Sequence, residues 1–247
     1  MPIIIKERSL RFVNKENGMN YAISDLHGRY DLFKKMLERI GFSDSDTLYL
    51  LGDCLDRGSD GCKIILDLAN RMNVVPIIGN HDFLAFYVLS KLSRALKPGE
   101  EADLSEIIGA WLMDGGKSTL DEFRALSPSE QKLVLSSIAD FRNYAELKVG
   151  GREFVLCHGG ISGYTPDRPL SDYSVENFIF KRTDYSKPIF TGNKYLVTGH
   201  TPTAAIEGAT EGKIYRANNH IAIDCGAVFD LGLGCICLDT LEEFYVK

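Results

Sequence analysis

Three short stretches decide the expected fold: residues 24–28 read Ser-Asp-Leu-His-Gly, residues 52–58 read Gly-Asp-Cys-Leu-Asp-Arg-Gly, and residues 79–82 read Gly-Asn-His-Asp. Each is followed by a helical pattern, and each is preceded by a short apolar run, at residues 21–23, 48–51 and 74–78. The second residues of the three stretches lie 28 and 27 residues apart, close to the roughly 30 residues of one strand–helix–strand unit. Open α/β sheets build their sites at the carboxyl ends of parallel strands. The pattern therefore predicts three successive parallel strands with polar ligands at one edge.

Two later stretches end apolar runs in the same way: residues 157–160 read Cys-His-Gly-Gly, and residues 199–202 read Gly-His-Thr-Pro. Four of the five histidines therefore lie in glycine-flanked turns, where glycine permits a close approach to a ligand. The stretches offer carboxylate, amide and imidazole ligands without a thiolate, a mixture that suits Mn²⁺, Fe or Zn²⁺. Six such ligands suit two ions that share a carboxylate better than they suit one open catalytic ion. The candidate metal ligands are Asp25, His27, Asp53, Asn80, His158 and His200, and Asp53 is the natural bridge.

The composition is that of an ordinary globular protein, with 247 residues, 45% of them apolar and 25% charged. A chain of this length buries a sizeable core without disulfides, and we expect all six cysteines to be reduced. The net charge of −6 argues against a protein that coats nucleic acid. The first residues do not resemble a secretory leader, and no apolar stretch approaches the roughly 18 residues of a membrane span. We expect a cytoplasmic protein with no membrane partner, and nucleic acid is disfavoured as a partner.

Periodicity divides the expected single domain, residues 1–247, into two halves. In the first half a short edge strand is expected at residues 3–5, and helical spacing occurs at residues 31–40, 61–70 and 82–92. A helical insertion at about residues 91–143 follows, with helices at residues 104–113, 118–126 and 129–141. From about residue 144 the period changes to two, which predicts mostly antiparallel strands at residues 144–149, 153–157, 195–198, 213–216, 220–224, 235–238 and near 244. The expected fold class is α/β (α+β): two mixed β-sheets packed face to face as a central sandwich, flanked by helices.

In this order, the five motifs resemble those of the PPP family of calcineurin-like metallophosphoesterases. The nearest match is the bacterial and phage branch, typified by bacteriophage lambda phosphatase. The motifs span Asp25 to His200, and residues 223–229 also resemble the ending of that branch. Residues 91–143 lie outside any motif of the family. Ser24 replaces the glycine usual at the first motif, and Asp82 replaces a glutamate common in eukaryotic members, but neither change removes a ligand.

The resemblance implies a calcineurin-like metallophosphoesterase fold and a role for each motif residue. Asp25, His27 and Asp53 hold one metal ion, whereas Asp53, Asn80, His158 and His200 hold the other. A metal-bridging hydroxide attacks phosphorus directly. His81 is the general acid, and Asp56 orients it. Arg57 binds the phosphate through its planar guanidinium. A second phosphate-binding arginine is expected between the last two motifs; Arg182 matches best and Arg168 is the alternative.

Several other features are expected to have no catalytic role. Residues 115–119 look like the end of a nucleotide-binding P-loop, but Trp111 occupies the position of its first glycine. His220 lies in an alternating strand, which favours a structural role. Cys54 and Cys157 adjoin candidate ligands, and filling apolar space is favoured over sensing oxidation.

The resemblance implies a metal-dependent phosphomonoester hydrolase, and the leading hypothesis is a serine/threonine protein phosphatase that acts on phosphorylated proteins or peptides. The alternative is a dinucleoside polyphosphate hydrolase or an RNA 5′-end phosphohydrolase, which has a similar metal core. Tetraphosphatases resemble Gly-Asp-x-x-x-Arg-Gly without the aspartate, so Asp56 favours the protein phosphatase. An inactive scaffold protein is disfavoured by the complete ligand set. The expected cofactors are two divalent ions, Mn²⁺ first, with Fe or Zn as alternatives. The oligomeric state is left open.

Overall fold

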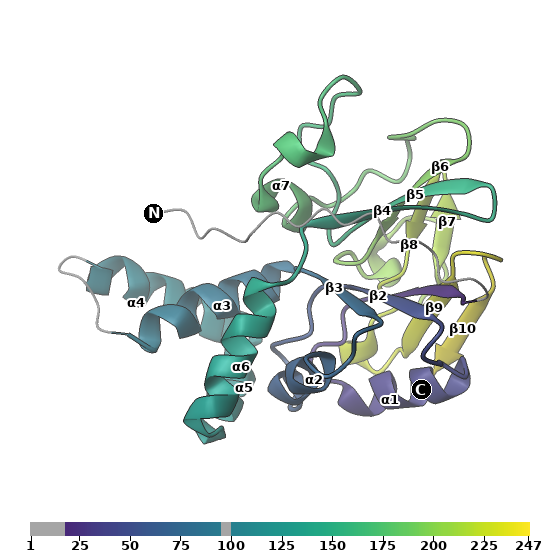
Figure 1. The fold of residues 1–247 in the computed structure, drawn as a ribbon. Coiled ribbons are helices and arrows are strands. Elements are labelled where there is room, and N and C mark those ends of the chain that lie inside the picture. The colour runs from purple at the N-terminus through teal and green to yellow at the C-terminus, as the bar shows by residue number, and fades with distance from the viewer. Residues whose placement is uncertain (1–17, 95–99) are drawn as a thin grey trace.

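The computed structural model describes residues 18–94 and 100–247, and two five-stranded sheets stack face to face within it (Figure 1). The first sheet has the strand order β10-β9-β1-β2-β3. Its parallel strands are those predicted from the first three motifs: β1 (Asn20–Ile23), β2 (Thr47–Leu51) and β3 (Val74–Ile77). The sheet is completed in antiparallel fashion by β9 (Leu233–Cys237) and β10 (Glu243–Val246). The predicted strand at residues 3–5 lies outside the described residues.

Helices follow each of the three parallel strands, as predicted: α1 (Tyr30–Arg39), α2 (Gly61–Leu68) and α3 (Asn80–Leu92). Helix α3 begins two residues before the predicted start. Gly79 is extended, and the Asp82 carboxylate accepts a hydrogen bond from the Gly79 N–H at 3.2 Å, which fixes this helix start. Asn80 and His81 therefore belong to the first helical turn, directly beyond the end of β3.

Helices occupy most of the predicted insertion: α4 (Glu100–Trp111), α5 (Lys117–Ala125) and α6 (Pro128–Ala139). Ser127 and Glu130 form a capping box at the start of α6. A kinked connection, Leu112–Gly116, joins α4 to α5, and its backbone is non-helical at Asp114 and Gly115. Helices α5 and α6 pack against α2, and α6 also packs against α3. The insertion therefore lies against the helices that follow the second and third motifs.

The second sheet has the strand order β4-β5-β6-β8-β7. Its strands are β4 (Tyr144–Val149), β5 (Arg152–Cys157), β6 (Lys194–Thr198), β7 (Tyr215–Ala217) and β8 (His220–Ala222). The prediction of mostly antiparallel strands is wrong for β5, β6 and β8, which are parallel neighbours. Long crossovers rather than hairpins join these three strands, and one of them contains helix α7 (Val175–Ile179). His158 and His200 therefore lie at the carboxyl ends of parallel strands, like the ligands of the first sheet.

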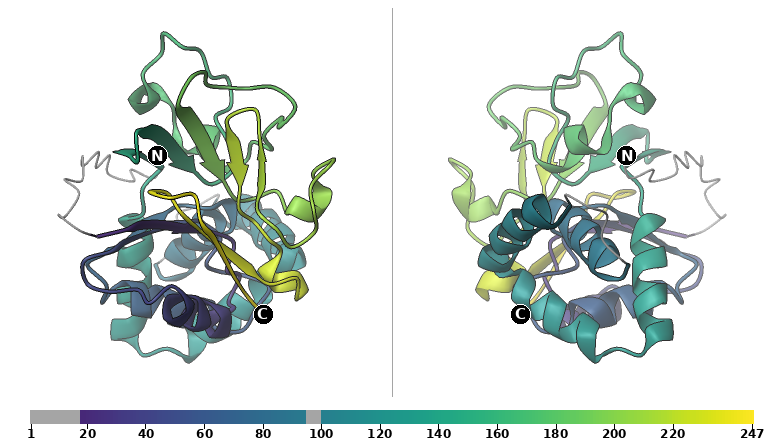
Figure 2. Two further views of the ribbon diagram at one scale, coloured as in Figure 1. Left: turned by 90° about the vertical axis from the view of Figure 1, so that its right-hand side faces the viewer. Right: turned by 90° about the vertical axis from the view of Figure 1, so that its left-hand side faces the viewer.

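The two faces of the first sheet bury different cores, because successive strand residues point to opposite sides. Ala22, Tyr49 and Leu51 pack between the two sheets. Ile23, Leu48 and Leu50 pack against the helices. Figure 2 shows the second sheet on one side of the first and helices α1 and α2 on the other. The predicted fold class, two mixed sheets flanked by helices, is confirmed; that residues 1–247 form a single domain remains a prediction.

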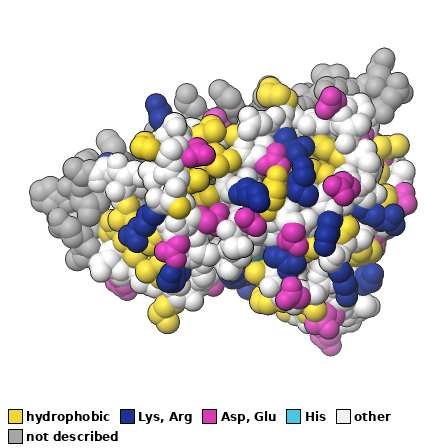
Figure 3. Space-filling model, turned by 90° about the horizontal axis from the view of Figure 1, so that it is seen from below, with side chains coloured by type: hydrophobic (Ala, Val, Ile, Leu, Met, Phe, Trp, Pro, Cys, Tyr) yellow, Lys and Arg dark blue, Asp and Glu magenta, His cyan; other side chains and the backbone are white. Residues whose placement is uncertain are grey.

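The surface over α1 and α2 carries basic and acidic side chains interspersed, and no histidine is visible on this face (Figure 3). Among the described residues, no helix is long and apolar enough to cross a membrane.

Candidate metal centre

Four of the six candidate ligands lie in the left-handed backbone region, with positive φ, which residues other than glycine rarely adopt. Asp25, His27, Asp53 and His200 have φ values of 51°, 42°, 52° and 63°. Such residues are uncommon outside glycine, and each costs on the order of 1 kcal/mol or more unless the surroundings hold it in place. Here the turns hold one another: Asp25 N–H donates to Gly52 C=O at 3.1 Å, and His27 N–H donates to Asp53 C=O at 2.8 Å. This clustering of strained residues is typical of a functional site.

Asp53 lies at the centre of the ligand cluster. Its Oδ2 atom is 3.6 Å from His27 Nε2 and 3.3 Å from His158 Nε2. Two groups of metal-ligating atoms, each within 4.8 Å of one another, share this residue: one includes His27, Asp53 and His81, and the other includes Asp53, His158 and His200. A Cβ at Gly79 would collide with the Asp53 carboxylate, so the adjacent turn requires glycine. The geometry fits one carboxylate shared between two cations.

The two imidazoles that face Asp53 are oriented by backbone carbonyls. His27 Nδ1 lies 2.9 Å from Leu55 C=O, and His158 Nδ1 lies 2.8 Å from Leu51 C=O. A carbonyl only accepts, so each Nδ1 donates. His27 Nε2 keeps a lone pair directed into the cluster, whereas His158 Nε2 faces the acceptors Asn80 Oδ1 and Asp53 Oδ2 and carries a proton. Metal-ligating histidines are commonly oriented in this way.

Asp25 and Asn80 complete the set of six predicted ligands. The Asp25 carboxylate accepts a hydrogen bond from His200 N–H at 3.0 Å, which ties the first turn to the last. Asn80 Oδ1 lies 2.9 Å from His158 Nε2. The structure therefore brings all six side chains together from the ends of five strands, β1, β2, β3, β5 and β6.

The cluster is electrostatically unbalanced without added cations. Burial raises the pKa of Asp25 to about 6 and lowers the pKa of His27 to about 4 and of His200 to about 3. Burial also raises the pKa of Asp224, which faces Asp25, well above its usual range. Burial thus disfavours the charged form of each of these groups: the deprotonated carboxylates and the protonated imidazoles. A divalent cation stabilises deprotonated carboxylates and neutral imidazoles together, so this donor set fits the metal ions that the sequence predicts.

The Asp53–His158 pair is the exception within this cluster. Burial alone would raise the pKa of Asp53, but the facing imidazole outweighs it and holds that pKa well below the usual range. Burial likewise opposes the charge on His158, but Asp53 raises its pKa to about 10. Protonated His158 therefore balances the charge of the Asp53 carboxylate, and a metal ion bound by His158 would have to replace that proton.

His81 lies beside the ligand cluster and is paired with Asp56. His81 Nδ1 lies 2.8 Å from Asp56 Oδ2, and both side chains are buried. Burial alone would lower the pKa of His81, but the hydrogen bond with Asp56 outweighs it, and the pKa is raised. Nε2, the other ring nitrogen, faces Arg57 Nη2 at 2.9 Å on the side of the ligand cluster. This geometry suits a proton donor, the role that the sequence analysis expects for His81.

Two arginines reach the site. Arg57 donates from Nη1 to His27 Nε2 at 3.0 Å, and its Nη2 lies 2.9 Å from His81 Nε2. His27 Nε2 cannot serve both Arg57 and a cation, so an ion bound by His27 would displace Arg57 from this contact. Arg182 donates from Nη1 to the His200 carbonyl at 3.5 Å, which places its backbone segment next to a ligand turn.

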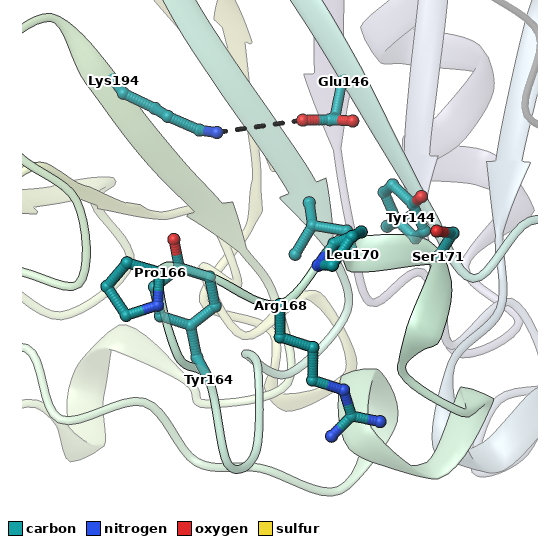
Figure 4. A pocket seen from close by; sticks show the side chains of 9 residues that line it. Tyr144, Glu146, Tyr164, Pro166, Arg168, Leu170, Ser171 and Lys194 are labelled. Atoms are coloured by element: carbon teal, nitrogen blue, oxygen red, sulfur yellow. Dashed lines mark ion pairs between the residues drawn. The ribbon is translucent and has the colours of Figure 1, made fainter.

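Arg168, the alternative phosphate-binding residue, lies in a different place. Its guanidinium stacks over the ring of Tyr173 at 4.0 Å. It also lines a cavity of about 310 Å³ beside β4, together with Tyr164 and Lys194 (Figure 4). None of the candidate metal ligands lines this cavity, so Arg182 remains the candidate for the second phosphate-binding arginine.

Comparison with known proteins agrees with this geometry. Residues 21–222 match the family model described as calcineurin-like phosphoesterase. The chain belongs to the calcineurin-like phosphoesterase family. An asymmetrical bis(5'-nucleosyl)-tetraphosphatase, PrpE, from a Geobacillus strain is 26% identical over 91% of this chain and 92% of its own length. This match spans nearly the whole of both proteins.

Two solved structures share the fold of this phosphoesterase. A protein provisionally assigned as a diadenosine tetraphosphatase has a TM-score of 0.65 at 16% identity and covers 95% of both chains. A protein serine/threonine phosphatase from Saccharomyces cerevisiae has a TM-score of 0.58 at 13% identity and covers 90% of this chain and 73% of its own. At these identities the likeness concerns the fold alone.

The sequence analysis missed the partners of Asp56 in this phosphoesterase. Trp111 Nε1 donates to Asp56 Oδ2 at 2.9 Å, and Thr119 Oγ1 donates to Asp56 Oδ1 at 2.7 Å. The Asp56 N–H in turn donates to Thr119 Oγ1 at 2.9 Å. None of the six candidate metal ligands lies in the insertion, but the insertion holds the carboxylate that orients His81. The available signal was the stretch from Trp111 to Thr119, which the sequence analysis considered only as a P-loop.

Replacing Thr119 with valine should therefore impair the phosphoesterase without touching a metal ligand. The valine keeps the shape but leaves the buried Asp56 carboxylate and its N–H without that partner, which costs about 2 kcal/mol of stability. We expect turnover to fall several-fold, because Asp56 then orients His81 less firmly. Thermal unfolding and steady-state kinetics measure both effects. Ser136→Ala removes an exposed hydroxyl of the same insertion and should change neither; an unaltered Thr119→Val enzyme would exclude this role.

Asp82, which stands where eukaryotic members have glutamate, organises the second turn. Its Oδ1 accepts hydrogen bonds from the N–H groups of Cys54 at 2.9 Å and Leu55 at 3.1 Å. The thiols of Cys54 and Cys157 lie next to candidate ligands. Burial raises the pKa of Cys54 well above its usual range and that of Cys157 to about 12, so both favour the protonated thiol. Both cysteines are buried and unpaired, which agrees with filling apolar space rather than with a reactive thiolate.

His220, the fifth histidine, lies apart from the cluster. Its Nε2 lies 2.8 Å from the Lys187 carbonyl, and burial lowers its pKa. Neither group of metal-ligating atoms includes it.

Proposed function

We propose that this calcineurin-like phosphoesterase hydrolyses dinucleoside tetraphosphates. The observation that carries the proposal is the near full-length relative named as an asymmetrical bis(5'-nucleosyl)-tetraphosphatase. The proposal replaces the protein phosphatase as the first candidate, although the sequence analysis used Asp56 to favour that reading. Asp56 acts on His81 rather than on a substrate, so its presence does not by itself select the molecule that is hydrolysed.

Two divalent ions are proposed as cofactors, with Mn²⁺ first and Fe or Zn²⁺ as alternatives. Asp25, His27 and Asp53 would hold one ion, and the other would be held by Asp53, Asn80, His158 and His200. When bound, the ions supply Lewis-acid chemistry, because they neutralise phosphoryl oxygens and make water a better nucleophile. The mixture of carboxylate, amide and imidazole atoms found in the cluster supports this assignment.

The remaining side chains handle the phosphoryl group and the leaving group. Arg57 and Arg182 would bind phosphoryl oxygens through their guanidinium groups. His81, oriented by Asp56, would give a proton from Nε2 to the departing oxygen. A nucleotide leaving from a polyphosphate is a weak base and needs this proton little, whereas an alkoxide leaving from phosphothreonine needs it strongly. The same residues can therefore serve both candidate reactions, but the two reactions depend on the His81 proton to different degrees.

A serine/threonine protein phosphatase is the second candidate, with phosphorylated proteins or peptides as substrates. The firmly held His81–Asp56 pair favours it, because that pair supplies the proton that an alkoxide needs. A place within the bacterial and phage branch, and a cytoplasmic location, remain parts of the proposal.

Substrate preference distinguishes these candidates. The protein would be stripped of metal with a chelator, reloaded with Mn²⁺, and assayed for kcat/KM on diadenosine tetraphosphate, a phosphothreonine peptide and an RNA bearing a 5′-triphosphate. We expect the dinucleotide to be preferred by at least about tenfold, the factor that corresponds to one well-placed substrate contact. A similar margin in favour of the peptide would make the protein phosphatase the correct reading, and a preference for RNA would support 5′-end processing. The same assays on Asp53→Asn protein, which should lose activity, control for a contaminating hydrolase.

A further inference from the structure

The insertion places a carboxylate between the two groups proposed to contact the phosphoryl group and the leaving oxygen. Asp114 Oδ1 lies 3.2 Å from Arg57 Nη2, and Asp114 Oδ2 lies 3.6 Å from His81 Nε2. The Asp114 side chain is 59% exposed and the Arg57 side chain is 31% exposed. Asp114 thus stands at the entrance to the site rather than in the core, and an anion that approaches Arg57 meets it.

The kinked turn between α4 and α5 fixes this position. Gly115 has φ of 104°, and its carbonyl accepts a hydrogen bond from Arg57 N–H at 3.0 Å. A Cβ at Gly115 would lie 2.6 Å from Arg57 Cγ, so only glycine allows the turn to pack this closely on the arginine. Asp114 is therefore aimed at Arg57 by the backbone, beyond the attraction between their charges.

We propose that the Asp114 carboxylate competes with the phosphoryl group for the guanidinium of Arg57. In the free enzyme its carboxylate is paired with Arg57. An arriving phosphoryl group has more charge and more acceptor oxygens, so it displaces the carboxylate from the guanidinium. A product that carries a phosphoryl group is in turn displaced by Asp114. The carboxylate thus weakens product binding and limits product inhibition. This inference rests on the proposed phosphate-binding role of Arg57.

Inorganic phosphate is the probe for this proposal. Its dissociation constant would be measured by calorimetry on Mn²⁺-loaded protein. Asp114→Asn keeps the shape and removes the charge, so phosphate should bind about two- to fivefold more tightly, the range expected when one competing exposed ion pair is lost. Asp121→Asn is the matched control, because Asp121 is an exposed carboxylate of the same insertion that pairs with Lys117 instead. The control should bind phosphate as the wild type does.

A double-mutant cycle with Arg57→Ala completes the test. Arg57→Ala should weaken phosphate binding, and Asp114→Asn should have little further effect in that background, since the competitor has lost its partner. Equal affinities of wild type and Asp114→Asn would overturn the proposal, as would the same tightening in Asp121→Asn. If Arg57→Ala left phosphate binding unchanged, the arginine assignment and this inference would both fail. A positive cycle in an enzyme that prefers the phosphopeptide would leave this inference standing and reject only the proposed substrate.

Discussion

Replacing His81 with asparagine should lower turnover about 10²- to 10⁴-fold, the usual contribution of a positioned proton donor, while both metal ions stay bound. Asparagine can keep a hydrogen bond toward Asp56, but it carries no proton to give to the departing oxygen. The loss should be larger for a phosphothreonine peptide than for diadenosine tetraphosphate, because an alkoxide needs protonation far more than a nucleotide phosphate does. Steady-state kinetics on both substrates, with metal content measured in parallel, provide the test.

The pH profile adds a second readout for His81. Because the hydrogen bond with Asp56 raises the pKa of His81, the wild type should keep its proton donor to higher pH than a free imidazole would. The alkaline decline in kcat that follows loss of this proton should disappear in His81→Asn. Normal turnover of the mutant on the peptide substrate, or an unchanged alkaline limb, would remove His81 from the mechanism.

Replacing Asp53 with asparagine should weaken the binding of both metal ions by more than about 100-fold each, since even residues that only support a ligand contribute 10- to 100-fold. The carboxylate faces His27 on one side and His158 on the other. An amide can offer one neutral oxygen in place of two charged ones, so neither site keeps its shared ligand. Calorimetric titration of chelator-stripped protein with Mn²⁺ measures the effect.

Asp25→Asn is the matched variant for Asp53→Asn, because Asp25 is also a buried carboxylate of the cluster. It is assigned to one ion only, so this variant should lose the tight binding of a single ion. Circular dichroism would confirm that both variants are folded. Loss of only one ion in Asp53→Asn, or of both in Asp25→Asn, would contradict the bridging assignment.

The clustering of the six candidate ligands was predictable, because it follows from short-range patterns. Each ligand turn ends a strand, and parallel strands bring their carboxyl ends to one edge, so the spacing of Asp25, Asp53 and Asn80 places them together. The second sheet was harder to predict. A period of two identifies the strand that precedes His158, but it does not distinguish a parallel neighbour from an antiparallel one.

The support of His81 could not be predicted, because it comes from distant sequence. Trp111 and Thr119 lie 55 and 63 residues beyond Asp56, and only the packing of the insertion against α2 and α3 brings them to that carboxylate. Asp114 depends on the kinked turn in the same way. Asp56 does not by itself select between the candidate substrates for a related reason: it orients His81, and a proton donor at that position can serve both candidate reactions, although the phosphothreonine reaction would need it more.

The most direct test of the two-ion centre is a crystal structure of Mn²⁺-loaded protein with anomalous scattering recorded at the manganese edge. The assignment predicts two anomalous peaks per chain about 3.5–4 Å apart. Asp53 should lie between them, with Asp25 and His27 on one side and Asn80, His158 and His200 on the other. A single peak, or two peaks that do not share Asp53, would contradict the assignment.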